Sequence, residues 1–191
     1  MSAGDLSDSF RDELNKALEP NYTIQHELSG GGMSRVFVAV EHALNRKVVI
    51  KVLKPDLAAG VNRDRFRREI MLVAQLHHPH IVPVLTAGER DDLLWYTMPF
   101  VEGESLRELI RSARQLSPRD VTRVLHDVLD ALDFAHTRGV IHRDIKPGNI
   151  LRQRSHSLVT DFGVAKALSA ALPHSGATSA GMAAHSPLAR P

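Results

Sequence analysis

The stretch IHRDIKPGNILRQRSHSLVTDFG, residues 141–163, constrains the fold of this chain more than any other part of its sequence. It sets two carboxylates, an amide and an amine among branched apolar residues; they belong to Asp144, Asp161, Asn149 and Lys146. Charged groups surrounded by apolar residues are costly unless they meet partners or a charged ligand. We therefore expect the fold to gather these four side chains, on two short loops, around one site.

The first half of the chain has the pattern of a β-rich unit that contains one helix. Alternating or β-branched residues predict five strands, at 22–28, 35–40, 47–53, 81–89 and 93–100. A helix is predicted over 63–76, where apolar residues recur on one helical face, and a short leading helix over 1–20, where Pro20 ends the pattern.

The second half is mostly helical. A short helix is predicted over 105–113, and a longer one begins after Ser117, where Pro118 occupies the first helical position and Asp120 has capping-box spacing. Gly139 is expected to end it. One apolar stripe runs along this helix, formed by Val121, Val124, Leu125, Val128, Leu129 and Leu132.

Strands with one helix, followed by helices, indicate an α+β fold of two lobes. The expected divisions are a leader helix at 1–21, a small β-rich lobe at 22–100, part of a helical lobe at 101–168 and a tail at 169–191. The tail has no periodicity and reads as loop or disorder.

Composition excludes several classes of protein. Lys and Arg total 24 against 22 Asp and Glu, without a long basic run, so no nucleic-acid partner is expected. The absence of cysteine excludes disulfides and thiolate metal sites. No apolar run is long enough to span a membrane, and the polar N-terminus is not a signal peptide, so a cytoplasmic location is expected.

A glycine-dense loop, SGGGMS at 29–34, joins the first two strands. Such a loop is either an ordinary hairpin turn or a place where backbone N–H groups approach a phosphate. Lys51, inside the apolar strand VVIKVL, favours the phosphate, because a lysine in an apolar strand needs a negative partner unless it reaches solvent at an edge. Glu69, on the following helix, is the carboxylate expected to hold it.

The chain resembles eukaryotic-type protein kinases, and most closely the bacterial serine/threonine kinases. The family's His-Arg-Asp-x-Lys-x-x-Asn loop matches residues 142–149, and its Asp-Phe-Gly matches residues 161–163. Both follow the glycine loop and the Val-Ala-Ile-Lys-like strand in the family's order. The resemblance implies ATP-dependent phosphoryl transfer to Ser or Thr hydroxyls of protein substrates.

The resemblance also implies the role of each residue. Asp144 accepts the proton of the incoming hydroxyl, Lys146 stabilises the transferred phosphoryl group, and Asn149 and Asp161 hold Mg²⁺ on ATP. Lys51 holds the α- and β-phosphates. The remaining residues of the implied ATP site are Ser29, Gly30, Gly31, Gly32, Met33, Ser34, Val36, Val49, Glu69, Met98, Pro99, Val101 and Leu151. Met98 is the implied gatekeeper, and Val36, Val49 and Leu151 flank the adenine.

Two features depart from the family pattern. The family's three loop glycines fall at Ser29, Gly31 and Ser34, so serine replaces two of them. After Asp-Phe-Gly the resemblance extends to about Met182 and then breaks before an Ala-Pro-Glu motif, so we expect a catalytic domain truncated after its activation loop. The chief alternative is an ATP-binding module that acts by binding a partner. A small-molecule kinase is a second alternative, which Lys146 disfavours.

The histidines of LHHPHIV, His77, His78 and His80, suggest a metal site when taken alone. The family commonly has a His-Pro-x-Ile-Val turn after this helix, so we interpret them as a packed turn. Val73, Val84, His142 and Phe162 are expected to stack between the lobes, with His142 as a scaffold residue instead of a base.

Overall fold

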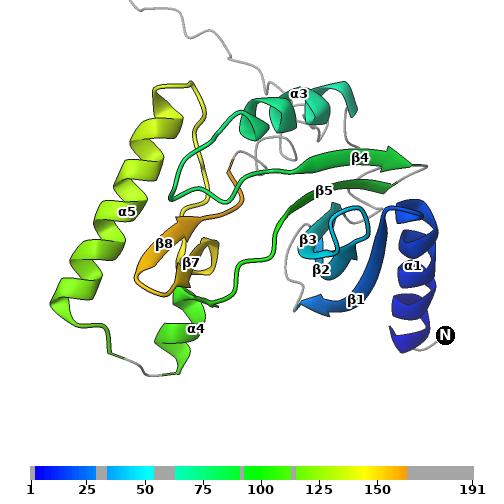
Figure 1. Ribbon diagram of the computed structural model, residues 1–191, viewed down its shortest axis with the longest axis horizontal. Coiled ribbons are helices and arrows are strands. Elements are labelled where there is room, and N and C mark those ends of the chain that lie inside the picture. The colour runs from blue at the N-terminus through cyan, green and yellow to red at the C-terminus, as the bar shows by residue number, and fades with distance from the viewer. Residues whose placement is uncertain (1–2, 29–33, 54–62, 91–92, 113–114, 163–191) are drawn as a thin grey trace, which may run out of the picture.

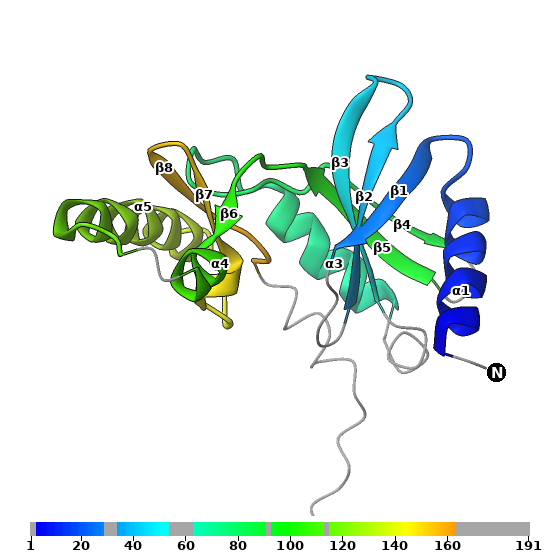
Figure 2. The same ribbon diagram turned by 90° about the horizontal axis from the view of Figure 1, so that it is seen from below.

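The computed structural model describes residues 3–28, 34–53, 63–90, 93–112 and 115–162 (Figure 1). None of the helices in these ranges is long and apolar enough to cross a membrane. Figures 1 and 2 place the first helix, α1 (Ala3–Leu18), at one end of the molecule and the longest described helix, α5 (Pro118–His136), at the other.

The small lobe is built on one five-stranded antiparallel sheet with the order β1-β2-β3-β5-β4. Its strands are β1 (Tyr22–Leu28), β2 (Ser34–Glu41), β3 (Arg46–Leu53), β4 (Thr86–Arg90) and β5 (Leu93–Pro99). Among the described residues, α1 (Ala3–Leu18) and α3 (Arg63–Ala74) accompany the sheet. The nearly continuous apolar runs of β3 and β5 are those of strands with two buried faces, and both strands are largely buried.

The two faces of the sheet pack against different helices. Val48, Ile50 and Val52 of β3 lie in one apolar cluster with Leu14 and Leu18 of α1. The intervening residues Val49 and Leu53 lie in another cluster with Phe66 and Ile70 of α3. Because side chains alternate along a strand, Lys51 extends from the α3 face. The α3 face of the sheet therefore presents the charged Lys51, whereas the α1 face contributes only to the apolar core.

The helical part contains α4 (Leu106–Arg111) and α5 (Pro118–His136) with a short 3₁₀ turn, η1 (Pro147–Asn149). Ser117 caps α5 by accepting a hydrogen bond from the Asp120 N–H. Gly139, with φ 73°, lies just past the helix in a conformation that other residues rarely adopt. The predicted N-cap and first-position proline of this helix are therefore confirmed, and the helix ends at His136, three residues before Gly139.

A second sheet was not anticipated from the sequence. It has the order β6-β7-β8, formed by β6 (Glu104–Ser105), β7 (Ile150–Gln153) and β8 (His156–Val159). The hairpin of β7 and β8 joins the two loops that carry Asp144 and Asp161. The strand expected over 81–89 is shorter than predicted, because β4 begins at Thr86 and Ile81 makes only an isolated bridge to Val159.

Candidate active site

Lys51 and Asp161 form the first half of the site. The Lys51 ammonium lies 2.6 Å from Oδ2 of Asp161, and both side chains are largely shielded from solvent. The Tyr96 hydroxyl donates a hydrogen bond of 3.3 Å to the other carboxylate oxygen. Lys51 and Tyr96 are paired in the register of β3 and β5, so the sheet itself sets their spacing. Side chains of the neighbouring strands β3 and β5 thus both bind the carboxylate of Asp161, which belongs to the other lobe.

Tyr96 is the site residue that sequence reasoning missed. Its side chain is almost fully buried, and burial, followed by the charge of Asp161, raises the pKa of its hydroxyl well above the ordinary value. It therefore remains a neutral hydrogen-bond donor. The sequence feature that could have indicated Tyr96 is its spacing of two residues from Met98. This spacing places both side chains on the face of β5 that packs against α3.

The partner of Lys51 in this structure differs from the predicted one, and its pairing with Glu69 stays a prediction. Lys51 pairs with Asp161 in this structure, whereas Glu69 was the predicted carboxylate. Glu69 lines a small cavity with Val140, Ile141 and Arg143, which lie at and before the catalytic-loop motif. The orientation of α3 directs Glu69 toward this loop. Sequence spacing does not determine that orientation.

Asp144, Lys146 and Asn149 form the second half. Lys146 Nζ lies 2.5 Å from Asp144 Oδ2, and Asn149 Nδ2 donates to the backbone oxygen and to Oδ2 of Asp144 at 2.9 and 3.2 Å. The hydrogen bond from Lys146 lowers the pKa of Asp144. The carboxylate is therefore ionised at neutral pH. It is also about 44% exposed, which leaves it open to an incoming molecule.

Asn149, which is buried, and Asp161, which is partly buried, offer oxygen atoms as metal ligands. Asn149 uses its Nδ2 hydrogens on Asp144, so its Oδ1 is the atom able to face a cation. Asp161 has φ 69°, and Arg143 in the other loop has φ 71°. Non-glycine residues in this region cost about 1–3 kcal/mol each and concentrate at functional sites. The two loops are thus strained at Asp161 itself and at Arg143, the residue before Asp144.

His142 holds both loops together by hydrogen bonds to their backbones. Its side chain is buried, its Nε2–H donates to the Thr160 carbonyl at 2.8 Å, and its Nδ1 accepts from the Asp144 N–H at 3.2 Å. Burial lowers the pKa of His142, in keeping with a neutral ring that donates at one nitrogen and accepts at the other. The expectation of a scaffold histidine is supported by this geometry.

The predicted stack between the lobes is assembled. Val73 and Phe162 belong to one apolar cluster against which Val84 packs. The ring of His142 meets Phe162 edge to face, with centroids 4.7 Å apart. These residues connect α3, the strand region and both loops.

The residues expected around adenine also lie together. Val49 and Met98 are core members of one cluster, and Val36, Val101 and Leu151 pack against it. Pro99 ends β5 opposite Val48, and Ser34, mostly buried, begins β2. The remaining predicted residues, Ser29, Gly30, Gly31, Gly32 and Met33, lie outside the described residues, as do Gly163 and the tail.

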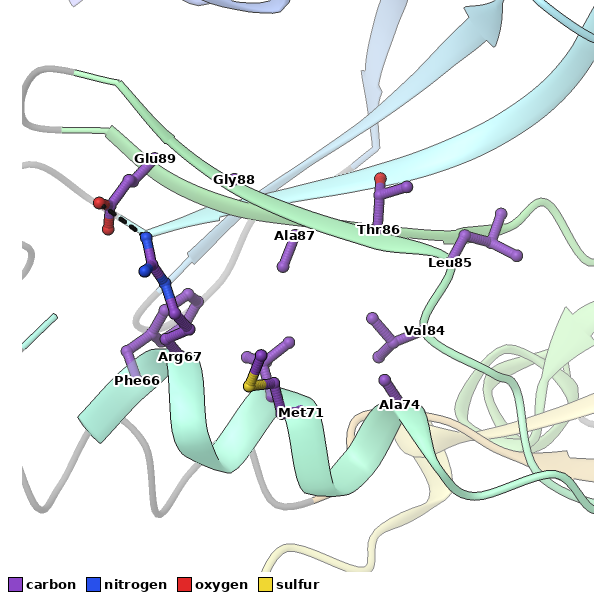
Figure 3. Close-up of a pocket in the computed structure, with 11 residues that line it drawn as sticks. Phe66, Arg67, Met71, Ala74, Val84, Leu85, Thr86, Ala87, Gly88 and Glu89 are labelled. Atoms are coloured by element: carbon purple, nitrogen blue, oxygen red, sulfur yellow. Dashed lines mark hydrogen bonds and ion pairs between the residues drawn. The ribbon is translucent and has the colours of Figure 1, made fainter. Parts of the chain in front are cut away.

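A cavity of about 460 Å³ lies between α3 and β4 (Figure 3). Apolar residues form most of its wall, and an ion pair of 3.1 Å between Arg67 and Glu89 crosses from the helix to the strand. None of the candidate catalytic residues lines it. The candidate site therefore consists of the two polar clusters and the adenine-side residues and lies apart from this cavity.

Comparisons with known proteins agree with this geometry. The protein kinase domain family model matches residues 22–184. A probable serine/threonine-protein kinase, pknA2 of Bifidobacterium longum, is 41% identical over 178 residues, which are 91% of this chain and 24% of that protein. The serine/threonine-protein kinase PrkC of Bacillus subtilis is 39% identical over 158 residues, covering 82% and 24%.

A solved structure of the Mycobacterium tuberculosis PknI kinase domain is 32% identical, with a TM-score of 0.66, and covers 81% of this chain and 67% of that one. The chain belongs to the protein kinase family, with bacterial serine/threonine kinases among its relatives. The predicted protein kinase family and the predicted two-lobed α+β fold are confirmed. The chain spans about a quarter of the length of these curated relatives.

Proposed function

We propose that this chain carries catalytic machinery for transferring the γ-phosphoryl group of ATP to Ser or Thr hydroxyls of proteins. The observation that carries the proposal is a pair of polar clusters, Lys51 with Asp161 and Asp144 with Lys146 and Asn149. His142 joins the loops that carry them, through hydrogen bonds to the Thr160 carbonyl and from the Asp144 N–H. Phosphoryl transfer requires positioning and charge neutralisation more than covalent chemistry from the protein. These clusters supply both.

Asp144 is the proposed acceptor of the substrate hydroxyl proton, and its lowered pKa keeps it ready to accept a hydrogen bond. Lys146, bonded to the same carboxylate, is placed to neutralise the transferred group. Lys51 is the proposed ligand of the α- and β-phosphates. Glu69 retains the proposed role of its partner in an active arrangement, because a strand lysine and helix glutamate must pair for kinase activity.

Asn149 and Asp161 are proposed to hold Mg²⁺. Amide and carboxylate oxygens are the donors that this hard cation prefers, so the residues fit the ion. When bound, Mg²⁺ neutralises the charge of the ATP phosphates. The base of ATP is proposed to lie between Val36, Val49 and Leu151, with backbone groups of Pro99 and Val101 at its edge and Met98 behind it. The proposed residues of the phosphate-side loop are 29–34, and a reducing cytoplasm suits a chain without cysteine.

The test is transfer of radiolabelled γ-phosphate from Mg-ATP to a basic protein rich in Ser and Thr, followed by identification of the labelled amino acid. Asp144→Asn preserves the shape of the side chain and should lower transfer by about a hundredfold to ten-thousandfold. Asp133→Asn, an exposed position on α5, is the matched control and should transfer normally. Undiminished transfer by Asp144→Asn would refute the assignment. Mg-ATP binding without transfer by the wild type would favour the binding module.

A further inference from the structure

Three side chains with metal-ligand chemistry meet away from the polar clusters described above. His80 comes from the loop that follows α3, Asp127 from the middle of α5 and His156 from the start of β8. One ligand atom from each lies within 4.8 Å of the others. Three segments that are distant in the sequence therefore converge on one point, where α5 packs against β8.

The hydrogen bonds of His80 fix its tautomer. Its Nδ1 lies 2.9 Å from the Ser157 carbonyl oxygen, which can only accept, so Nδ1 carries the proton. Nε2 is left with a lone pair, and it faces Oδ1 of Asp127 at 3.6 Å. Two lone pairs that face each other repel unless a proton or a cation lies between them. The arrangement therefore calls for positive charge at this point.

Asp127, like His80, is oriented by a hydrogen bond to the backbone of Ser157. Only 6% of its surface is exposed, and its Oδ2 accepts the backbone N–H of Ser157 at 2.8 Å. Ser157 thus positions both His80 and Asp127 through its own peptide groups. Ligands held by backbone groups through their second atom are characteristic of metal sites in proteins. A buried carboxylate also needs a compensating cation.

The neighbouring histidines have other partners, which separates them from the site. His78 accepts the His80 N–H at its Nδ1, so its proton is on Nε2, which lies 3.4 Å from Oδ2 of Asp130. His77 is exposed and its ring nitrogen lies 3.1 Å from the Gln75 oxygen. The run of three histidines in the sequence therefore contributes one ligand, and the other two are satisfied elsewhere.

His156 supplies the third ligand. Its ring centroid lies 6.0 Å from that of His80, and its side chain is exposed at the turn between β7 and β8. In a tetrahedral zinc site with bonds of about 2.0–2.1 Å, adjacent ligand atoms lie roughly 3.3 Å apart. The 3.6 Å between His80 Nε2 and Asp127 Oδ1 is close to that value. An exposed side chain can complete the geometry by a change of rotamer.

We propose that His80, Asp127 and His156 bind a divalent transition-metal ion, for which zinc is the best match. Two imidazoles and one carboxylate suit zinc better than magnesium or calcium. The exposure of His156 leaves the fourth position to water. The ion would join the loop before Ile81, helix α5 and the β7–β8 hairpin.

The experiment is a titration of the full chain with Zn²⁺ against a competing chelator, with Co²⁺ as a spectroscopic probe and thermal melting as a second readout. We expect one equivalent of Zn²⁺ to bind, visible absorption bands of tetrahedral Co²⁺, and a rise in Tm of roughly 5–10 °C at a hundredfold excess over Kd. His156→Ala removes one exposed ligand and should weaken binding about tenfold or more.

His77→Ala is the matched control, because it removes an exposed histidine of the same loop region and should leave binding unchanged. Asp127→Asn keeps an acceptor for the Ser157 N–H and should also lose the metal; if it does not fold, His156→Ala decides. The proposal is overturned if the wild type binds no zinc, if His156→Ala binds as tightly as the wild type, or if His77→Ala loses as much affinity as His156→Ala.

Discussion

Asp161 shows how single residues set this site. Its backbone is held in the left-handed region while Lys51 and Tyr96 bind its two carboxylate oxygens. The strain of the backbone is tolerated because the side chain is fixed from two strands at once. The position of the carboxylate is therefore a property of the sheet as much as of its own loop.

Tyr96→Phe tests this role directly. The change removes one hydrogen bond and no volume, so the chain should fold normally and bind Mg-ATP roughly twofold to tenfold more weakly. Titration calorimetry measures the affinity. Tyr22→Phe is the matched control, because the Tyr22 hydroxyl bonds Thr86 in the same sheet but outside the site. Equal affinities in the two variants would rule out a positioning role for Tyr96.

His142 predicts a dependence of stability on pH. Its folded pKa is lowered by burial, so below about 6.5, its ordinary pKa, the unfolded chain takes up a proton that the folded chain does not. The free energy of unfolding should then fall as the pH drops, by at most about 1.4 kcal/mol per unit for this one group, until the folded pKa is reached.

Denaturant unfolding between about pH 5 and pH 8 measures this slope. His142→Gln keeps one donor and one acceptor and lacks the titration, so its stability should fall less steeply with decreasing pH than that of the wild type. The slope is compared, not the absolute stability, which the substitution also changes. Parallel curves for the two proteins would show that His142 does not titrate differently on folding.

Residue types and order predict that Asp144, Lys146, Asn149 and Asp161 belong to one site. The hairpin of β7 and β8 then brings the two loops together. In this structure Lys51 pairs with Asp161. Its pairing with Glu69 stays a prediction, because that pairing depends on the orientation of α3 against the loops. Tyr96 was missed because an aromatic residue in an apolar strand has the same pattern whether its hydroxyl is used or not.

At the scale of elements, α5 has a buried side and an apolar side that is exposed. Val124, Val128 and Ala131 belong to the core of the helical lobe. Val121, Leu125 and Leu129, predicted from the sequence as part of one stripe, are 42%, 56% and 63% exposed. Contiguous exposed apolar side chains favour association. The stripe predicted from periodicity is therefore divided between core and surface.

We expect the chain to associate through this exposed face. The double substitution Leu125→Gln and Leu129→Gln should reduce concentration-dependent association in sedimentation velocity, with a stability change within about 0.5 kcal/mol per site, because neither side chain is in the core. Leu44→Gln, at an isolated exposed leucine in the turn after β2, is the control and should change nothing. A monomeric wild type, or equal association of all variants, would contradict this expectation.

Strong local signals account for the elements that were predicted well. Helix α5 has a cap, a first-turn proline and a terminal glycine, and the strands of the first sheet are rich in β-branched residues. The strands of the second sheet are only two to four residues long, and polar residues such as Arg152 and Gln153 interrupt their pattern. Their pairing is set by tertiary contacts, for example the close approach of Gly103 to the Arg152 carbonyl, where a Cβ would lie 2.0 Å away.

In the whole molecule, the division of the sheet into two faces organises function. One face of β3 packs on α1 and serves only as core, and the other directs Lys51 toward Asp161 of the helical part. We expect Lys51 and the loop carboxylates together to form a site for Mg-ATP. Binding by this chain depends on that geometry whether or not a protein substrate is engaged.

The most direct measurement is the change in Tm with Mg-ATP for the wild type, Lys51→Met and Lys47→Met. Lys47 lies on the same strand and is exposed, so it controls for the loss of one lysine from β3. The wild type and Lys47→Met should be stabilised by Mg-ATP to the same extent, and Lys51→Met should show no stabilisation although it melts as a folded protein. An equal rise in Lys51→Met, or no rise in the wild type, would contradict the account.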